Sequence, residues 1–388
     1  MRLAISLVLG LAASPLAAQT CGGPVADFID GVKAEAMADG RTQAEVDRFF
    51  SGASIDDAVL RADRAQGVFQ KDFISFSRAL ISQNRIDNGA IYGDRNDATF
   101  DRIEAEFGIP RGVLLAFWAF ETDYGQVQGN FNTRNALLTL AHDCRRPELF
   151  RPQLIAAIEL AATGGMDPAS TTGAWAGEIG QVQMLPLDII ERGIDGDGDG
   201  KVTLKTSSAD ALMSGANVLS SLGWRPNEPW LQEIIVPDTL DWALTGLDQP
   251  RPVADWAAMG VEGRNAALNT SLEGSVLLPM GRNGPAFLAY PNFEVYFEWN
   301  KSFVYVTTAA YFGTRLEGAP VYDAGSPSPA LSGEDIKALQ TRLEARGHDV
   351  GGIDGILGAK TRAAVQAEQV RLGLPADAWP TQQLLNGL

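Results

Sequence analysis

Apolar residues recur every three or four positions along most of the chain, a spacing that is typical of amphipathic helices. Between Leu231 and Tyr305 the pattern changes, because short β-type runs such as Ile234-Ile235-Val236 and Phe293 to Phe297 lie between Pro, Gly and Asn. We therefore expect a mainly α-helical (α+β) fold with a small inserted β-sheet. Helices are predicted at Phe28 to Met37, Val46 to Phe50, Phe69 to Gln83, Asp97 to Phe107, Val113 to Glu121, Leu154 to Ala162 and Ala209 to Leu222.

The C-terminal part of the chain shows a separate pattern. Pro320 to Leu331 (PVYDAGSPSPAL) is rich in Pro, Ser and Gly and lacks hydrophobic periodicity, which predicts a linker over 321–331. Three short helices follow, marked by Ile336, Leu339 and Leu343, by a start near Thr361, and by Leu384 and Leu385. Since a domain usually has about 150 residues, we predict a main domain over 19–320 and a three-helix domain over 332–388.

The N-terminus has the composition of an export signal. Arg2 precedes a mostly apolar run, Leu3 to Ala13, and Leu16-Ala17-Ala18 forms a small-residue cleavage site. This arrangement predicts a cleaved signal peptide over 1–18. The run is shorter than the ~20 apolar residues that span a bilayer, so no membrane span is expected. Lipidation is not expected either, because Gln19-Thr20 precede Cys21 where lipidation signals carry small residues.

Cys21 and Cys144 are the only cysteines. In an exported chain the oxidising compartment favours a disulfide between them, which would hold the N-terminus in place. The alternative is a reactive Cys144 paired with His142. Residues two apart on a helix do not face each other, which argues against that pair.

Charge and histidine content exclude some functions. The 31 basic and 48 acidic side chains give a formal net charge of −17. Because affinity for nucleic acid comes largely from Lys and Arg, this balance argues against a nucleic-acid partner. His142 and His348 are the only histidines, which argues against a multi-His zinc site or a Ser-His-Asp triad.

Glu121 ends an unusually apolar helix. Val113 to Phe120 are apolar on every face, so this helix is expected to run through the core, with Gly125 as its terminator. Desolvation raises the pKa of a carboxyl group in such a place, which is what general-acid chemistry on a glycosidic oxygen requires. From this segment alone, a helix-end Glu that bonds to backbone or pairs with an Arg remains an open alternative.

A series of segments in fixed order resembles the lytic murein transglycosylase B family. They are AFWAFETDYG, NALLTLAHDCRRPELF, GAWAGEIGQVQMLP, the DGDGDG loop, ADALMSGANVLSSLGW and YPNFEVYFEWNKSFVY, and together they cover most of residues 25–320. The C-terminal segment LSGEDIKALQTRLEARGHDVGGIDGILGAKTRAAVQ resembles a small peptidoglycan-binding repeat domain. The resemblance implies a lysozyme-like lytic transglycosylase domain over 19–320 and a peptidoglycan-binding domain over 332–388.

The resemblance also implies a reaction. In that family the Glu of the ET-x-x-G motif, here Glu121, is the sole catalytic acid and base. It cleaves the β-1,4 bond between N-acetylmuramic acid and N-acetylglucosamine without water and leaves a 1,6-anhydro ring, a substrate-assisted exception among glycosidase-like reactions. The implied protein is a soluble periplasmic monomer that acts on glycan strands and requires no cofactor.

Other family positions imply substrate contacts. Gln183 matches a sugar-binding glutamine, Asn300 and Tyr305 match an Asn and a Tyr near the end of the domain, and Trp299 replaces a usual Tyr, which keeps an aromatic ring for stacking. Arg145 and Arg146 match an arginine pair for peptide carboxylates. For Gln183 and the arginines, a core-capping amide and ordinary surface charges are the alternatives.

The DGDGDG loop carries Asp195, Asp197 and Asp199 at positions 1, 3 and 5 of an EF-hand-like opening. Three hard oxygen ligands suit a structural Ca²⁺, but position 12 is Thr206 rather than Glu. Asp210 is the candidate for the missing carboxylate, as a later Asp is in the resembled family. The alternative is a solvated turn that binds no metal.

Two other functions are alternatives for this sequence. A hydrolytic muramidase would use Asp123 as a second carboxylate, but a residue two positions from Glu121 on a helix points elsewhere. A catalytically inactive wall-binding scaffold is disfavoured because Glu121, Gln183 and Asn300 are all present. In the small domain, Glu368 replaces the aromatic residue of a usual Phe-Gln pair, so weak polymer affinity is expected.

Overall fold

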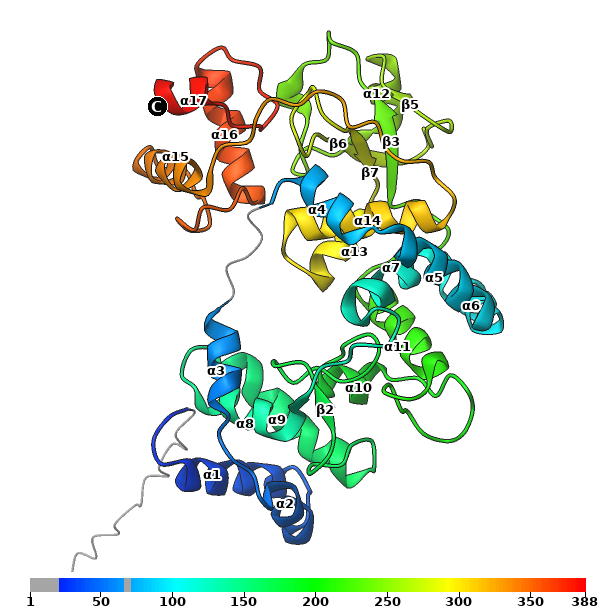
Figure 1. Ribbon diagram of the computed structural model, residues 1–388, viewed down its shortest axis with the longest axis vertical. Helices are drawn as coiled ribbons and strands as arrows, with labels where there is room; N and C mark the ends of the chain where they lie inside the picture. The colour runs from blue at the N-terminus through cyan, green and yellow to red at the C-terminus, as the bar shows by residue number, and fades with distance from the viewer. Residues whose placement is uncertain (1–20, 66–70) are drawn as a thin grey trace, which may run out of the picture.

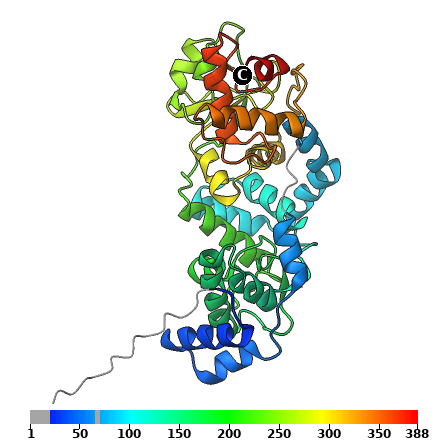
Figure 2. The same cartoon turned by 90° about the vertical axis from the view of Figure 1, so that its left-hand side faces the viewer.

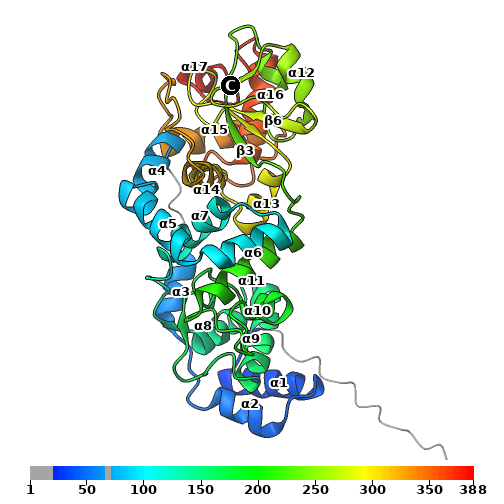
Figure 3. The same ribbon diagram turned by 90° about the vertical axis from the view of Figure 1, so that its right-hand side faces the viewer.

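The structure is a computed structural model that describes residues 21–65 and 71–388. The predicted signal peptide over 1–18 lies outside the described residues. The described chain is elongated: the helices that follow the N-terminus lie at one end, and the sheet and the C-terminal helices lie at the other (Figures 1 and 2). Helices α7 (Arg111–Thr122), α13 (Asn292–Trp299) and α14 (Phe303–Leu316) lie between these ends (Figure 3).

The first end is a group of helices that pack around α8 and α9. Its members are α1 (Val25–Ala38), α2 (Gln43–Phe50), α3 (Asp57–Arg64), α8 (Thr133–His142), α9 (Pro147–Ala162) and α10 (Pro186–Arg192). A disulfide joins Cys21 to Cys144, as expected, with the two Cα atoms 5.2 Å apart. Because this bond ties the start of the described chain to the turn after α8, α1 is held against the rest of the group.

The central helix is α7 (Arg111–Thr122), and Gly112 to Ala119 are buried on all of its faces, as the apolar run predicts. It packs against α14 (Phe303–Leu316), α5 (Gln83–Arg95), α6 (Asp97–Phe107) and α11 (Ser208–Ser221). A Cβ atom on Gly112 would lie 2.6 Å from Gly313 O, so glycine allows α7 and α14 to meet backbone to backbone. The helix ends at Thr122, one residue after the predicted end at Glu121, and Asp123 rather than Gly125 terminates it, because Asp123 and Tyr124 adopt positive φ angles.

The predicted small sheet is present and antiparallel, in the order β4-β6-β7-β3-β5. Its strands are β3 (Leu231–Ile235), β4 (Arg251–Pro252), β5 (Glu262–Gly263), β6 (Glu273–Leu277) and β7 (Phe287–Ala289), and α12 (Val253–Ala258) covers it. Ile234, Trp256, Val276, Leu288 and Tyr290 form part of its own apolar core. A separate pair of two-residue strands, β1 (Phe131–Asn132) and β2 (Thr172–Gly173), lies near α8.

Two predicted elements were wrong. Phe293 to Phe297 lies in helix α13 (Asn292–Trp299) and not in a strand, because Phe293 and Tyr296, three residues apart, are both buried on one helical face. The helix predicted over Phe69 to Gln83 is instead α4 (Phe73–Leu80), followed by the start of α5. Side chains of Asp72 and Ser82 cap the two helices, which separates them.

The C-terminal residues form the three predicted helices, α15 (Gly333–Ala345), α16 (Ala359–Arg371) and α17 (Gln382–Gly387), around their own core. Glu368, at the position expected to be aromatic, accepts hydrogen bonds from Arg371 (2.7 Å) and contacts His348 (2.8 Å). An ion-pair cluster therefore replaces the usual aromatic contact.

The segment between the two units is held along the main unit. It has no helix or strand, yet Tyr322 is buried and its hydroxyl lies 2.8 Å from Ser77 Oγ, while Ser326 N donates to Asn283 O (2.7 Å). Trp379 Nε1 donates to Ser328 O (3.1 Å) from the C-terminal side. The predicted linker is therefore an ordered segment that is hydrogen-bonded to both units.

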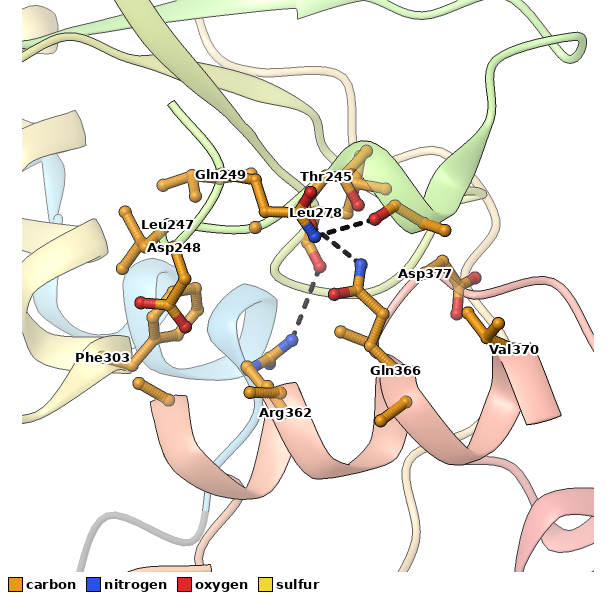
Figure 4. A pocket seen from close by; sticks show the side chains of 17 residues that line it. Thr245, Leu247, Asp248, Gln249, Leu278, Phe303, Arg362, Gln366, Val370 and Asp377 are labelled. Carbon is orange, nitrogen blue, oxygen red and sulfur yellow. Dashed lines mark hydrogen bonds between the residues drawn. The ribbon is translucent and has the colours of Figure 1, made fainter. Parts of the chain in front are cut away.

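The C-terminal unit docks on the sheet region through α16 (Figure 4). Arg362 is buried, donates to Pro279 O (2.6 Å) and lies 4.6 Å over the ring of Phe303. Gln366 donates to Thr245 O (2.8 Å). A cavity of about 580 Å³ remains between α16 and the loop that holds Thr245.

Within residues 21–65 and 71–388, no helix has both the length and the apolar character needed to cross a membrane.

Candidate active site

Glu121 lies at the C-terminal end of α7 with one carboxylate oxygen held by two donors. Tyr305 OH donates to Oε1 at 2.8 Å, and Trp299 Nε1 donates to the same oxygen at 3.1 Å. The other oxygen makes no hydrogen bond with the described residues. As a residue Glu121 is half-buried, and this second oxygen, which has no hydrogen-bond partner, is available to a substrate.

The packing of α7 on α14 explains this geometry. Gly112 meets Gly313 at one end of the contact, and Glu121 meets Tyr305 at the other. At a rise of 1.5 Å per residue, the nine steps from Gly112 to Glu121 and the eight steps from Tyr305 to Gly313 span about 12 to 14 Å each. The two helices run in opposite directions, so contact at the glycines brings the two functional side chains together.

Aromatic packing fixes the two donors. The ring of Trp299 lies 4.5 Å from that of Phe117, and the ring of Tyr305 lies 5.8 Å from that of Phe120. Both phenylalanines belong to α7, so the helix that carries the carboxyl group also positions its partners. Rings held in this way keep their hydrogen-bonding atoms in place without a conformational search.

Burial raises the pKa of Glu121 above its usual value, while the hydrogen bonds from Tyr305 and Trp299 oppose the rise because they favour the carboxylate. Burial and the neighbouring Glu121 hold the pKa of Tyr305 well above its usual range, so Tyr305 stays a neutral donor. The arrangement favours proton retention by Glu121 and also stabilises its ionised form once the proton has gone. A single carboxyl group here can thus act as an acid and then as a base.

Hydrogen bonds hold the segment from Gln181 to Met184 beside Glu121. Thr122 Oγ1 donates to Gln181 O at 2.5 Å, and Gly125 N donates to Thr122 Oγ1 at 2.8 Å. Gly125 has φ 83°, a left-handed backbone conformation that favours glycine at this turn.

Gln183 and Asn300 lie in the neighbouring segments but do not bond to Glu121. Gln183 has φ 53° and donates from its side chain to Gly180 O at 2.7 Å. Asn300 accepts from Ser302 N at 2.9 Å and so helps to start α14. Both side chains are partly exposed. The structure therefore brings Tyr305 and Trp299 to Glu121 and leaves Gln183 and Asn300 outside hydrogen-bonding distance of it.

Arg145 and Arg146 both pair with Asp63, a buried residue of α3 that the sequence analysis missed. Arg145 also donates to Asp63 O at 2.8 Å. The two arginine side chains remain 43% and 31% exposed, so they can still reach another carboxylate. Asp63 is 82 and 83 residues away in sequence, and no local pattern links it to them.

Asp123, the second carboxylate of the hydrolytic alternative, forms an ion pair with Arg85 at 3.1 Å. It occupies the left-handed position that ends α7. The Asp123 carboxylate is thus engaged by Arg85 and forms no hydrogen bond with Glu121.

The acidic loop brings together three of its four predicted ligands. Oxygens of Asp195, Asp197 and Asp210 lie within 4.8 Å of one another, while Asp199 is not part of this group. Asp210 is fully buried and accepts from Gly196 N at 2.9 Å, and Asp195 accepts from Gly200 N at 2.7 Å. The donor set is entirely hard oxygen, which fits Ca²⁺.

Glu178, which no sequence motif indicated, lies in the turn after β2. Its Oε2 atom is buried without a hydrogen-bond partner. Burial is the main cause that raises the pKa of Glu178 to about 7, and Glu121 adds to the rise. The backbone N–H groups of Glu178 and Ala176 and the charge of Arg146 oppose it. The only local feature that indicates a buried carboxyl group here is a single acidic residue among the apolar and glycine residues of AWAGEIG.

Comparison with known proteins places the two units in families. Residues 24–314 match the model of the transglycosylase SLT domain, and residues 332–388 match that of a peptidoglycan binding domain. Over 250 residues the chain is 23% identical to the membrane-bound lytic murein transglycosylase B of Escherichia coli (strain K12), covering 64% of this chain and 68% of that protein.

Solved structures agree with these matches. SltB3 from Pseudomonas aeruginosa, in complex with NAG-anhNAM-pentapeptide, is 34% identical with a TM-score of 0.86, covering 94% of this chain and 99% of that one. A second complex of SltB3 holds NAG-NAM-pentapeptide. Slt35 of Escherichia coli in complex with calcium shares the fold at a TM-score of 0.65 and 22% identity, covering 79% of this chain and 98% of that one. The predicted fold class and family resemblance are therefore confirmed.

Proposed function

The chain belongs to the transglycosylase SLT domain family, whose matched relatives are lytic murein transglycosylases acting on peptidoglycan, and we propose that Glu121 alone performs its chemistry. The proposed reaction cleaves the β-1,4 bond between N-acetylmuramic acid and N-acetylglucosamine and leaves a 1,6-anhydro-muramoyl end. The observation that carries this proposal is a carboxyl group with a raised pKa, one oxygen held by two neutral donors and the other free.

In the first step, protonated Glu121 donates its proton to the glycosidic oxygen. The bond from the anomeric carbon to that oxygen breaks, and the N-acetylglucosamine unit leaves with a new hydroxyl. The C2 acetamido group of the muramoyl sugar stabilises the positive charge on the anomeric carbon. Tyr305 and Trp299 stabilise the carboxylate left on Glu121, because both keep donating to its Oε1 atom.

In the second step, the Glu121 carboxylate takes the proton of the C6 hydroxyl. The C6 oxygen then bonds to the anomeric carbon and closes the anhydro ring. Glu121 is protonated again, so no water is consumed and the residue is ready for another cycle. The complex of SltB3 with an anhNAM-containing ligand supports this product class for the family.

Several further assignments belong to the same proposal. Gln183, Asn300, Arg145 and Arg146 contact the substrate around Glu121, and the docked C-terminal domain helps to position the glycan strand. Asp195, Asp197 and Asp210 would hold a structural Ca²⁺ that stiffens the loop before α11, and no cofactor takes part in the reaction. The protein acts as a monomer in the periplasm after removal of residues 1–18.

Mass spectrometry of purified glycan strands after digestion tests the reaction. Products lighter than the hydrolytic ones by one water are expected. Reducing ends would show a hydrolytic muramidase and overturn the proposal. A properly folded protein that binds strands but releases nothing would show an inactive scaffold.

A further inference from the structure

Two side chains in the first turn of α14 face different parts of the molecule. Tyr305 donates its hydroxyl to Oε1 of Glu121 at 2.8 Å, whereas the centre of the Phe303 ring lies 4.6 Å from Cζ of Arg362, a residue of the C-terminal unit. Because a helix turns by about 100° per residue, residues two positions apart lie on roughly opposite faces. The first turn of α14 is therefore held between the proposed acid and the C-terminal unit.

Local hydrogen bonds support the start of α14 only weakly. Ser302 is the N-cap residue, and its Oγ atom accepts from Tyr305 N at a long 3.4 Å. The backbone contact of α14 with α7, between Gly313 and Gly112, lies about 12 Å further along the helix. Since the first N–H groups of a helix lack partners within it, this turn depends on side-chain contacts for its position.

Arg362 is buried and contacts both α14 and the segment after β6. Its guanidinium lies 4.6 Å from the centre of the Phe303 ring and 5.6 Å from that of the Trp379 ring, and it donates to Pro279 O at 2.6 Å. The ring of Phe297, in α13, lies 6.3 Å from that of Phe303. The position of Phe303 therefore depends on the α13 ring and on Arg362.

Arg362 carries its charge without an ion pair. Burial lowers its pKa to about 10, so the guanidinium stays protonated at neutral pH. Asp377, the carboxylate that acts on this charge, pairs with Arg282 at 3.1 Å, and none of the ion pairs among residues 21–65 and 71–388 includes Arg362. A buried cation of this kind is stabilised by carbonyl oxygens and by the faces of aromatic rings, so the contact with Phe303 stabilises both residues.

The rest of the C-terminal unit fixes the helix that carries Arg362. Trp379 belongs to the main apolar core, and a Cβ atom on Gly281 would lie 2.7 Å from the Cβ atom of Trp379, so the two segments are closely packed. Gln366, one turn after Arg362 on α16, donates to Thr245 O at 2.8 Å (Figure 4). Arg362 is therefore presented to α14 by a docked helix.

We propose that Arg362 is a positioning residue for the reaction: through Phe303 it holds the first turn of α14, and with it the hydroxyl group of Tyr305, in place on Glu121. The role rests on the proposed function, because Arg362 acts through the bond that Tyr305 makes to the catalytic acid. A small displacement of this donor weakens its hydrogen bond to the carboxylate that forms during the reaction, which lowers turnover more than substrate affinity. The C-terminal unit then supports turnover as well as contact with the polymer.

The test is kcat for cleavage of a soluble fragment of two NAG-NAM units, at saturating concentration, by the full-length mature protein and its Arg362→Ala variant. The variant is expected to lower kcat about 3- to 10-fold, less than the loss expected for Tyr305→Phe, because the donor is displaced and not removed. KM is expected to change by less than about 2-fold, since the contact acts on the transition state more than on the bound substrate.

A double-mutant cycle with Tyr305→Phe separates positioning from general damage to the fold. Because Arg362 acts through the Tyr305 hydroxyl, Arg362→Ala is expected to lower kcat by less than about 2-fold once that hydroxyl is absent. Phe303→Leu removes the ring but leaves the bond from Arg362 to Pro279 O, and it is expected to show the same dependence on Tyr305. This second variant decides the case in which Arg362→Ala does not fold.

Lys360→Ala is the matched control, since Lys360 is exposed on the same helix and pairs with Asp349, and its kcat is expected to follow that of the unmodified chain. Unchanged kcat in folded Arg362→Ala and Phe303→Leu overturns the inference. Equal losses with and without the Tyr305 hydroxyl do so too, because they show a merely structural role, and a rise in KM alone assigns Arg362 to substrate contact.

The products of the unmodified protein distinguish the two proposals. Products without an anhydro ring refute the proposed function itself, whereas anhydro products together with any of these contrary results refute only the role of Arg362.

Discussion

The hydroxyl group of Tyr305 donates a 2.8 Å hydrogen bond to Oε1 of Glu121, although 184 positions separate the two residues in the chain. This bond connects the end of α7 with the first turn of α14. It stabilises the carboxylate form of a group whose pKa burial raises. The pKa of Glu121 is therefore set by the balance between its burial and its hydrogen bonds.

Glu121→Gln is expected to lower turnover by about 10³-fold or more, because the amide can neither donate an acidic proton nor take one back. The amide oxygen can still accept from Tyr305 and Trp299, so the fold and sedimentation with peptidoglycan are expected to stay unchanged. Release of soluble muropeptides measures the loss. Glu298→Gln, which removes an exposed carboxyl group paired with Lys301, serves as the control. Substantial activity in Glu121→Gln would exclude Glu121 from the reaction.

Tyr305→Phe is expected to move the alkaline limb of the pH profile to higher pH. The hydrogen bond from Tyr305 lowers the pKa of Glu121, so its loss lets that pKa rise. Turnover is expected to fall about 10- to 100-fold, since the carboxylate loses a donor. Tyr296→Phe is the matched control, because the Tyr296 hydroxyl is buried without a partner and is not bonded to Glu121. A limb that stays in place would argue against this account of the Glu121 pKa.

Glu178→Gln is expected to stabilise the protein above neutral pH. The folded-state pKa of Glu178 lies near 7, above its ordinary value of 4.5. The unfolded chain therefore loses this proton first, and the free energy of unfolding falls as pH rises from about 4.5 to about 7. The variant lacks this loss, so its advantage is expected to grow by about 1 to 3 kcal/mol between pH 4.5 and pH 8. Chemical denaturation at both pH values measures it, and an equal difference at the two values would contradict the burial of an ionisable group there.

Calcium is expected to raise the melting temperature by a few degrees at millimolar concentration, because an ion that binds only the folded state stabilises it. Asp195→Asn is expected to reduce the shift, since it removes a charged oxygen from the group formed with Asp197 and Asp210. Glu191→Gln, outside this group, keeps the shift. Identical melting curves with calcium and with chelator would favour a metal-free turn stabilised by its backbone hydrogen bonds.

Arg362→Ala is expected to loosen the C-terminal unit, since a buried guanidinium that donates to Pro279 O and lies over Phe303 would be lost. The change is expected to cost about 2 to 3 kcal/mol of docking free energy. Proteolysis within 320–331 is expected to become faster, because this segment is hydrogen-bonded to both units and loosens when the C-terminal unit does. Lys360→Ala, on the exposed side of α16, is the control. Unchanged proteolysis would show that Arg362 does not secure the contact.

Local patterns in the sequence determined the elements whose stability is mainly local. The apolar run from Val113 to Phe120 predicts a buried helix, and α7 is buried on all sides because no face of it is polar. The spacing of Ile336, Leu339 and Leu343 predicts α15, whose core is made within a few dozen residues. The order of the transglycosylase segments also identified the family, which the comparisons confirm.

Features that depend on residues distant in the chain were decided by the tertiary structure and not by local sequence patterns. Phe293 to Phe297 forms a helix because Phe293 and Tyr296 are buried on one face, a fact that the alternation of apolar and charged residues conceals. The pairing of Arg145 and Arg146 with Asp63 likewise follows from the packing of α3 near α8.

The active-site electrostatics show the same division most clearly. Sequence placed Glu121 at the end of an apolar helix, but its protonation depends on groups that the fold brings to it, Tyr305 and Trp299 from the far end of the main unit. Periodicity reports which face of a helix is buried. Desolvation and charge coupling depend on distances in space, and only the folded chain sets those distances.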